Sequence, residues 1–228
     1  MPLVHREVLR FVLKRKAIKS QSLVLTFDDG PSSRLTPAIL KILDENNAKA
    51  SFFLLGRNIQ SREEIVRQLA KQGHEICSHG YGHVHYWKVW PWHSISDIKK
   101  SWQAINAALG KDKRDKYPFR PPYGRLNLVC LVYLLLHRVP IVYWSFAIGD
   151  TTVPAHRDKH KALEHLKKSA GAVTLAHDFE RNREDTSKMI LEVTGSLLAQ
   201  AKIKGMKVIT VSELLRTKRQ VYQPRVAQ

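Results

Sequence analysis

Two adjacent carboxylates, Asp28 and Asp29, stand where a run of strand-forming residues ends in a Gly-Pro turn. Successive side chains of a strand point to opposite sides, so one carboxylate can bind a cation while the other remains available as a base. An isolated Asp-Asp-Gly sequence is more often an ordinary acidic turn. Taken alone, this pair therefore leaves both interpretations open.

Two histidines four residues apart, His79 and His83, follow a second strand-like segment. On a helical turn this spacing places both imidazoles on one side, within reach of a single metal ion. The chain contains 11 histidines, so the spacing is weak evidence by itself. Together with one carboxylate, the two imidazoles would leave coordination positions open, as a catalytic metal site requires.

Two further polar side chains stand at the ends of strand-like segments. Arg120 precedes two prolines that stiffen the backbone, and it could hold a carboxylate through paired hydrogen bonds. The alternative for this segment is a surface proline turn. His177 ends the buried segment 173–177, and in a parallel β/α barrel that end of a strand faces the active site. A lone histidine in such a place would more often be a satisfied core residue.

The order of these four segments resembles that of the polysaccharide deacetylase family, the NodB-like enzymes of carbohydrate esterase family 4. TFDDGP at 26–31, SHGYGH at 78–83, RPPYG at 120–124 and VTLAH at 173–177 match the family motifs in order. The resemblance covers roughly residues 20–215. It implies an α/β fold of the deformed (β/α) barrel type and a divalent metal, most often Zn²⁺, although Co²⁺, Ni²⁺ or Fe²⁺ would also fit an Asp-His-His site.

The resemblance also implies a role for each matching residue. Three residues would bind the metal: Asp29, His79 and His83. Three would act on the amide bond: Asp28 as general base, Arg120 by orienting Asp28, and His177 as the general acid that protonates the departing amine. Three would contact the substrate: Pro122, Tyr123 with its backbone N–H toward the oxyanion, and Leu175 against the acetate methyl group. The implied reaction is metal-dependent hydrolysis of the N-acetyl group of an amino sugar in a glycan or glycoconjugate.

Two segments depart from the family pattern. Gly80 stands where the family usually has Ser or Thr, which removes a hydroxyl that would brace the loop. In the fourth motif, Ala147 stands where a carboxylate would tune the catalytic histidine, and Thr151 stands where an aromatic residue is usual. Without that carboxylate His177 would be less basic, unless another group such as Asp150 or Asp178 takes its place.

The segment after the metal histidines is rich in aromatic residues. Trp87 and Trp90, with their neighbours Tyr86 and Trp92, could form a platform against the faces of sugar rings. A loop that packs its tryptophans onto the barrel is an equally good interpretation, because tryptophan is mostly buried in proteins. Two alternatives to sugar deacetylation remain. The same site could act on a small non-sugar amide, or the chain could be a catalytically weak protein that only binds an anionic glycan.

Stepwise alternation of short apolar runs and amphipathic segments predicts a mainly parallel sheet with helical crossovers. Strands are expected at 22–27, 50–55, 75–78, near 119, and at 141–146, 172–176 and 207–211. Helices are expected after an N-cap at Thr36, after a capping box at Ser61–Glu64, and at 96–109, 128–136 and 185–204. We expect a single domain: a basic N-terminal arm at 1–20, the NodB-like domain at 21–216 and a C-terminal tail at 217–228.

The chain is strongly basic, with 38 Lys and Arg against 20 Asp and Glu and a formal charge of +18. Such a charge attracts polyanions, but a solvated basic surface explains it equally well. The absence of a nucleic-acid-binding motif argues against nucleic acid as a partner. No secretory signal pattern is recognisable at the start, which predicts a cytoplasmic location.

The apolar segment 128–136 allows two interpretations. A helix that is apolar all round is normally buried, which is the expectation here. The alternative is peripheral contact with an anionic membrane, aided by the basic N-terminal arm, with a lipid-linked amino sugar as substrate.

Overall fold

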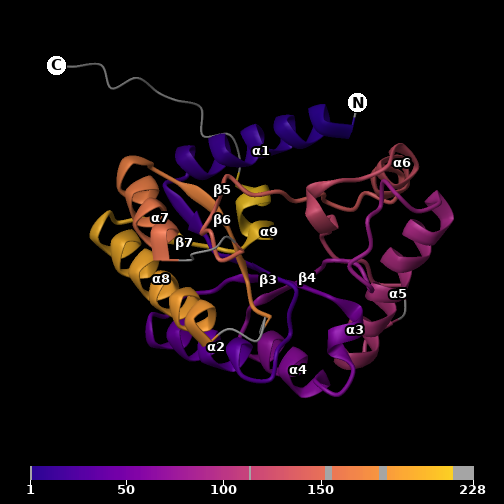
Figure 1. Cartoon of the computed structure of the whole chain (residues 1–228), viewed down its shortest axis with the longest axis horizontal. Helices are drawn as coiled ribbons and strands as arrows, with labels where there is room; N and C mark the ends of the chain where they lie inside the picture. The colour runs from indigo at the N-terminus through magenta and orange to yellow at the C-terminus, as the bar shows by residue number, and fades with distance from the viewer. Residues whose placement is uncertain (1, 113, 152–155, 180–183, 218–228) are drawn as a thin grey trace.

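A parallel sheet lies at the centre of the molecule and helices surround it (Figure 1). The computed structural model describes residues 2–112, 114–151, 156–179 and 184–217. Within this part of the chain the strands are β1 (Ser22–Val24), β2 (Thr26–Asp28), β3 (Ser51–Leu54), β4 (Glu75–Ser78), β5 (Phe146–Ala147), β6 (Ala172–His177) and β7 (Lys207–Val208). The α-helices are α1 (Pro2–Lys19), α2 (Leu35–Glu45), α3 (Gly56–Ile59), α4 (Glu63–Lys71), α5 (Pro91–Leu109), α6 (Leu128–Leu136), α7 (His156–Lys168), α8 (Glu184–Ile203) and α9 (Val211–Arg216).

β1 and β2 behave as one strand that changes neighbours. Leu23 pairs with Ala172 and Phe27 with Ala176, so both segments keep the same register against β6. On the other side β1 pairs with β7, whereas β2 pairs with β3. The sheet order is therefore β4-β3-β2-β6-β1-β7, with β5 on the other side of β6.

Isolated bridges close the sheet into a distorted barrel. Ser78 at the end of β4 pairs with Phe119, and Phe119 pairs with Ile141. The chain that follows Ile141 reaches β5, which pairs with β6. The ring thus runs from β6 through β2, β3 and β4 and back to β6. All of its pairings are parallel, and the prediction of a deformed β/α barrel in a single domain is confirmed.

The core between sheet and helices is made by aliphatic and aromatic side chains with helical or alternating spacing. In α2, Ile39, Leu40 and Leu43 are buried at intervals that place them on one helical face. β3 is buried along its whole length, as expected for a central strand of a parallel sheet with both faces covered. These elements hold the carboxyl ends of β2, β4 and β6 together at one edge.

Helix α1 packs against β1 and β6 and was not predicted as a helix. Leu13 and Ala17 are buried on its inner face. Gly171, just before β6, allows this close approach, because a Cβ there would lie 2.1 Å from the backbone oxygen of Ala17. α7 was also not predicted. Thr217 is the last described residue of the predicted tail 217–228, and the rest of that tail lies outside the described residues.

Both predicted helix caps are wrong in detail. Thr36 lies inside α2, and the hydroxyl of Ser32 instead accepts hydrogen bonds from the amides of Leu35 and Thr36. Ser61 does not cap α4, whose N-cap is Arg62 without a side-chain hydrogen bond. The Thr36 hydroxyl is used elsewhere, since it donates to the Asp178 carboxylate.

The expectation that the helix at 128–136 is buried is also wrong. In α6 only Cys130 and Leu134 are fully covered, and the face that carries Leu128, Leu135 and Leu136 is exposed. The helix packs on α5 by one narrow side, which leaves most of its apolar surface in contact with solvent. No described helix combines the length and apolar character that crossing a bilayer requires.

Candidate active site at the carboxyl ends of the strands

The predicted metal ligands and both predicted proton-transfer groups meet at one edge of the barrel. Asp28 is the last residue of β2 and His177 the last residue of β6, and the two are register partners. His79 follows the end of β4, and Arg120 follows the bridge at Phe119. This is the edge at which parallel β/α barrels carry their active sites.

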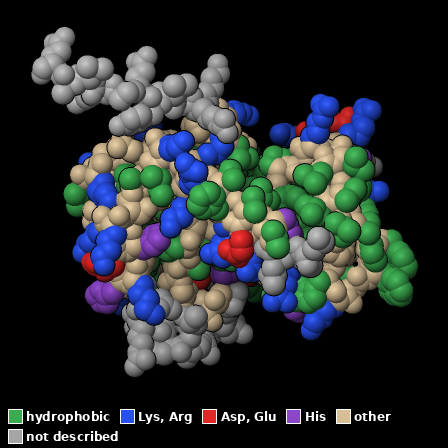
Figure 2. Space-filling view, turned by 90° about the horizontal axis from the view of Figure 1, so that it is seen from above, with side chains coloured by type: hydrophobic (Ala, Val, Ile, Leu, Met, Phe, Trp, Pro, Cys, Tyr) green, Lys and Arg blue, Asp and Glu red, His purple; other side chains and the backbone are tan. Residues whose placement is uncertain are grey.

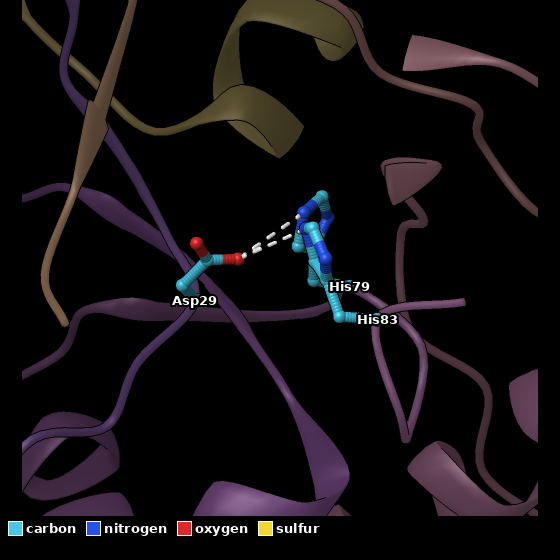
Figure 3. A group of neighbouring side chains, drawn as sticks. All are labelled: Asp29, His79 and His83. Atoms are coloured by element: carbon cyan, nitrogen blue, oxygen red, sulfur yellow. Dashed lines mark ion pairs between the residues drawn. The ribbon is translucent and has the colours of Figure 1, made fainter. Parts of the chain in front are cut away.

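Asp29, His79 and His83 converge on one point (Figure 3). The Oδ1 atom of Asp29 lies 3.5 Å from Nε2 of His79 and 3.4 Å from Nε2 of His83. One potential ligand atom from each residue lies within 4.8 Å of the others. Asp29 has a φ of 72°, so the chain turns sharply after β2 and aims its carboxylate differently from that of Asp28.

The three side chains fit a divalent cation. Ligand distances of about 2.0–2.2 Å in tetrahedral geometry separate neighbouring ligand atoms by roughly 3.3 Å, close to the spacings found here. Nδ1 of His79 lies 2.8 Å from the carbonyl oxygen of Arg120. Donation of its proton to that carbonyl leaves Nε2 with a lone pair toward Asp29. Burial, followed by the nearby His79, lowers the pKa of His83 to about 4, which keeps this imidazole neutral as a ligand must be.

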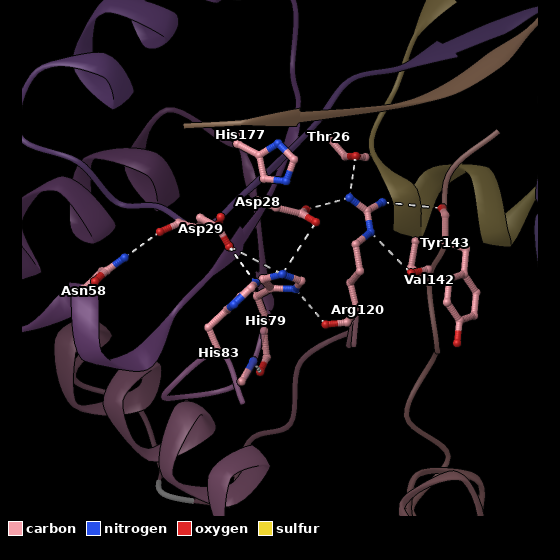
Figure 4. A network of polar contacts seen from close by, with 12 residues as sticks. Thr26, Asp28, Asp29, Asn58, His79, His83, Arg120, Val142, Tyr143 and His177 are labelled. Carbon is pink, nitrogen blue, oxygen red and sulfur yellow. Dashed lines mark hydrogen bonds and ion pairs between the residues drawn. The ribbon is translucent and has the colours of Figure 1, made fainter. Parts of the chain in front are cut away.

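Asp28 is held by a fully buried guanidinium (Figure 4). Nη1 of Arg120 donates to Oδ1 of Asp28 at 2.6 Å and to the Thr26 hydroxyl at 2.7 Å. The other guanidinium nitrogens face the carbonyl oxygens of Val142 and Tyr143 at 3.3 and 3.4 Å. The second carboxylate oxygen of Asp28 points toward the metal-ligand cluster, 3.8 Å from Nε2 of His79. Arg120 thus fixes one oxygen of Asp28 and leaves the other directed into the site.

His177 is paired with Asp150. The carboxylate of Asp150 lies 3.0 Å from Nδ1 of His177 and also accepts the backbone N–H of His177 at 2.7 Å. Burial lowers the pKa of His177, but the charge and hydrogen bond of Asp150, with smaller contributions from Asp29 and Asp28, outweigh it and raise the pKa to about 9. Asp150 thus supplies the carboxylate that is missing at Ala147, which is one of the two alternatives expected from the sequence. Ala147 lies in β5, and the chain turns back to His177 at Asp150.

A third buried carboxyl group supports the turn after β2. Burial raises the pKa of Asp178 to about 7, against the opposing hydrogen bond from Thr36. A Cβ at Gly30 would lie 2.2 Å from Oδ1 of Asp178, so only glycine fits there. Asp178 therefore supports the backbone around Asp29 and does not contact the imidazole of its neighbour His177 through any described hydrogen bond.

The model of the polysaccharide deacetylase family matches residues 15–135, more than half of the chain. This chain belongs to the polysaccharide deacetylase family. A peptidoglycan-N-acetylglucosamine deacetylase of Bacillus cereus is 31% identical over 200 residues, which cover 86% of this chain and 89% of that protein. The resemblance seen in the four motifs is thereby confirmed.

Other relatives in the deacetylase family extend this result. The peptidoglycan-N-acetylglucosamine deacetylase PgdA of Listeria monocytogenes is 31% identical over 210 residues, which are 90% of this chain but 41% of PgdA. This chain therefore spans about two fifths of the length of that relative. Among solved structures, the Bc1960 peptidoglycan N-acetylglucosamine deacetylase has a TM-score of 0.76 at 29% identity, covering 88% of this chain and 91% of that one.

Gly80, which departs from the pattern of the deacetylase family, is explained by its surroundings. Its φ is 82°, and a Cβ there would lie 2.5 Å from the hydroxyl of Tyr86 and 2.6 Å from Oδ2 of Asp97. Asp97 accepts the amides of Tyr81 and Gly82, both at 2.8 Å, and the Tyr86 hydroxyl at 2.6 Å. A carboxylate from α5 thus braces the loop between the two histidines in place of the missing hydroxyl.

Aromatic rings form the rim of the site next to His83. Tyr123 is about half exposed, and its ring lies 4.6 Å from that of His83 and stacks on His85 at 3.9 Å. Trp87 meets Tyr123 edge-on at 5.7 Å. Trp90 lies farther along the loop and stacks on Trp92 at 4.9 Å, both rings being exposed.

The two remaining predicted substrate contacts are also near the site. Leu175 is buried on β6 and shares the face of His177, two residues later. Pro122 is buried and begins the short 3₁₀ turn that carries Tyr123.

Two residues that position the site were not singled out by the sequence. Asp97 lies within a helix, where nothing in the local pattern distinguishes it from a surface carboxylate. Asn58 donates to the backbone carbonyl of Asp29 at 2.6 Å and fixes the turn from α3. The sequence indicates Asp150 only as an alternative partner for His177. Its position just after Gly149 in a polar turn was the available signal, because glycine allows the chain to turn back toward β6.

Proposed function

We propose that this protein removes the N-acetyl group from an amino sugar in a glycan or glycoconjugate by metal-dependent hydrolysis. The proposal rests on one arrangement: the Asp-His-His cluster lies between two proton-transfer groups, Asp28 and His177, and a different charged side chain fixes each of them. Asp28 is fixed by Arg120 on one side, and His177 is paired with Asp150 on the other. Relatives of similar length that are named as peptidoglycan-N-acetylglucosamine deacetylases support the same substrate class.

Asp29, His79 and His83 would hold the divalent ion. Zn²⁺ suits one carboxylate and two imidazoles, and Co²⁺, Ni²⁺ and Fe²⁺ accept the same ligands. When bound, the ion supplies a Lewis acid that polarises the acetamide carbonyl and lowers the pKa of water.

The side chains of the site account for the proton movements. The free oxygen of Asp28 accepts a proton from water as the water oxygen bonds to the carbonyl carbon. The backbone N–H of Tyr123 donates to the carbonyl oxygen as it gains negative charge. His177, kept protonated by Asp150, gives its proton to the nitrogen as the C–N bond breaks. The products are acetate and the free amine of the sugar.

The substrate contacts follow from the same orientation. The acetyl methyl group would lie against Leu175, on the face of β6 that carries His177. The sugar ring would lie on the rim formed by Tyr123 and Trp87, while Pro122 fixes the turn of Tyr123. Trp90 would reach only a more distant part of a longer substrate.

The test is acetate release from N-acetylglucosamine oligomers, peptidoglycan fragments and a simple acetanilide, with added Zn²⁺ or with a chelator. Asp28→Asn keeps the shape of the base but not its basicity, and Asp112→Asn, in an exposed surface turn, is the matched control. We expect release from a sugar substrate that is lost with chelator and with Asp28→Asn and retained in Asp112→Asn.

Other outcomes would contradict the proposal in distinct ways. Release from acetanilide but from no sugar would assign a non-sugar amide as substrate. Metal binding without release from any compound, combined with glycan binding that is unchanged in Asp28→Asn, would indicate a binding protein.

A further inference from the structure

Helix α6 presents an uncharged apolar face to solvent. Leu128, Leu135 and Leu136 are 70%, 61% and 78% exposed, and Val129 and Val132 lie on the same side. These positions follow the i, i+1, i+4, i+7, i+8 spacing of one helical face, while Cys130 and Leu134 on the opposite side are buried. A soluble surface rarely keeps so continuous a run of large aliphatic side chains without a partner.

Helix α1 has a second exposed apolar stripe on the side away from the barrel. Val4, Val8, Phe11 and Ile18 recur at spacings of three, four and seven residues, and Phe11 is 59% exposed. The inner side of the same helix is occupied by Leu13 and Ala17. Because α1 is apolar on both sides, the packing of its inner side against the sheet leaves the outer stripe uncovered.

Both helices approach the rim of the site. A Cβ at Gly124, next to Tyr123, would lie 3.6 Å from the Arg6 side chain of α1. Figure 2 looks onto α1 and α6 and shows hydrophobic side chains over both, with Lys and Arg among them. The N-cap of α6, Asn127, donates to the Ser94 hydroxyl in the first turn of α5, which places α6 near the exposed Trp90–Trp92 pair. The chain between Tyr123 and Asn127 connects the rim directly to α6.

The charges around these faces are mostly positive. α1 contains six basic side chains, Arg6, Arg10, Lys14, Arg15, Lys16 and Lys19, and one acidic side chain, Glu7. Lys14, Arg15 and Lys19 are exposed beside the apolar stripe, and the guanidinium of Arg15 lies 5.4 Å over the Phe11 ring. α6 itself has no charged residue. A second copy of this chain would bring like charges together, whereas an anionic lipid surface would complement them.

We propose that α1, α6 and the Trp90–Trp92 pair form a docking surface for an anionic lipid bilayer. The aliphatic side chains enter the boundary between headgroups and acyl chains, the tryptophan pair lies at headgroup level, and the basic side chains of α1 contact lipid phosphates. This orientation brings the rim at Tyr123 to the membrane surface. If the proposed deacetylase activity holds, the substrate class is then an N-acetylated amino sugar attached to lipid.

Co-sedimentation of the full chain with vesicles tests the docking surface directly. Vesicles of phosphatidylcholine with 30% phosphatidylglycerol are compared with pure phosphatidylcholine at low and high salt. We expect at least tenfold stronger partitioning onto the anionic vesicles, and weakening by salt. Since each basic residue near such a surface contributes about fivefold, Lys14→Glu with Arg15→Glu should lower partitioning by 25-fold or more.

The apolar contribution is tested with Leu135→Ser combined with Leu136→Ser. Ile203→Ser is its matched control, because Ile203 is as exposed as Leu136 but lies at the end of α8. Lys41→Glu with Lys71→Glu is the control for charge reversal, because these exposed side chains lie on α2 and α4, on the opposite side of the molecule from α1 (Figure 1). We expect the two test variants to lose partitioning, and both controls to retain it within about twofold. All four replace exposed side chains, and unchanged thermal unfolding verifies that they fold.

The result that would overturn the proposal is equal partitioning of test and control variants, or no partitioning at all. Concentration-dependent dimerisation that disappears in the α6 variant, without vesicle binding, would assign the face to a second copy instead. Vesicle binding is measured without substrate, so its failure leaves the deacetylase proposal standing. Absence of acetate release would equally leave the docking result standing.

Discussion

The charge of Asp150 should determine the pH range in which His177 can donate a proton. Asp150 lies 3.0 Å from Nδ1 of His177 and is the main cause of the raised pKa of about 9. Asp150→Asn keeps the side-chain shape and removes the charge. Burial, which lowers the pKa of the imidazole, then acts against only the weaker fields of Asp29 and Asp28. We expect the pKa of His177 to fall to its ordinary 6.5 or below.

The expected loss of kcat follows from the pKa of His177 with and without the charge of Asp150. A group with a pKa of about 9 is about 90% protonated at pH 8, and one with a pKa of 6.5 is about 3% protonated. If the protonated form of His177 is the acid, kcat at pH 8 should fall about 30-fold in Asp150→Asn. The loss should shrink as the pH is lowered to 6, because the imidazole is then protonated again.

The same substitution should change the pH dependence of stability. A pKa raised in the folded state stabilises the protein fully below pH 6.5, and this contribution is lost as the pH rises through about 9. The free energy of unfolding of the unsubstituted protein should therefore decline between pH 6.5 and 9 more steeply than that of Asp150→Asn. Urea unfolding at a series of pH values measures this difference without any substrate.

The assay is the pH profile of kcat for acetate release, together with NMR titration of His177. Asp178→Asn is the matched control, because this neighbouring buried carboxyl bonds to Thr36 and not to the imidazole. An alkaline limb that stays near pH 9 in Asp150→Asn would refute the reasoning. If Asp178→Asn shifted the alkaline limb equally far, the total negative charge near the site, and not the contact with Asp150, would set the pKa of His177.

Two further substitutions test how the site is supported. Arg120→Met leaves the Asp28 carboxylate buried without its cation. It should lower the free energy of unfolding, measured by urea unfolding, by about 3–5 kcal/mol. Arg125→Met, at the exposed rim, is the control and should change this free energy by less than about 0.5 kcal/mol. Gly171→Ala would place a Cβ 2.1 Å from a backbone oxygen of α1 and should cost about 1–3 kcal/mol. Gly195→Ala, with open space in α8, should instead stabilise by about 0.5–1 kcal/mol. An unchanged free energy of unfolding in Arg120→Met or in Gly171→Ala would contradict these arguments.

The barrel and most of the candidate site could be predicted because they depend on local patterns. Buried strands such as β3 and β6 are continuous apolar runs, and the residues at their carboxyl ends must meet at one edge of a parallel sheet. That rule alone brings Asp28 and His177 together. The motif order then singles out His79, His83 and Arg120 as partners at the same edge.

The features that were missed depend on contacts between distant segments. Asp97 braces the histidine loop from α5, 14 residues after His83, and only the folded chain shows that its carboxylate faces Tyr86 and not solvent. The exposure of α6 was missed for a similar reason. Its composition predicts a buried helix, but among the described residues its main helical contact is with α5, which covers a single narrow side.

The two histidines of the site show why residue type alone does not determine role. Burial lowers the pKa of both His83 and His177. Near His83 the next-largest influence is the neighbouring imidazole of His79, so its pKa falls to about 4 and it stays neutral, as a metal ligand should be. Near His177 the carboxylate of Asp150 outweighs burial, so its pKa rises to about 9 and it stays charged, as an acid should be. His177 thus stays charged because the turn after β5 places the Asp150 carboxylate 3.0 Å from its Nδ1. At His83, burial and the neighbouring imidazole outweigh the Asp29 carboxylate at 3.4 Å.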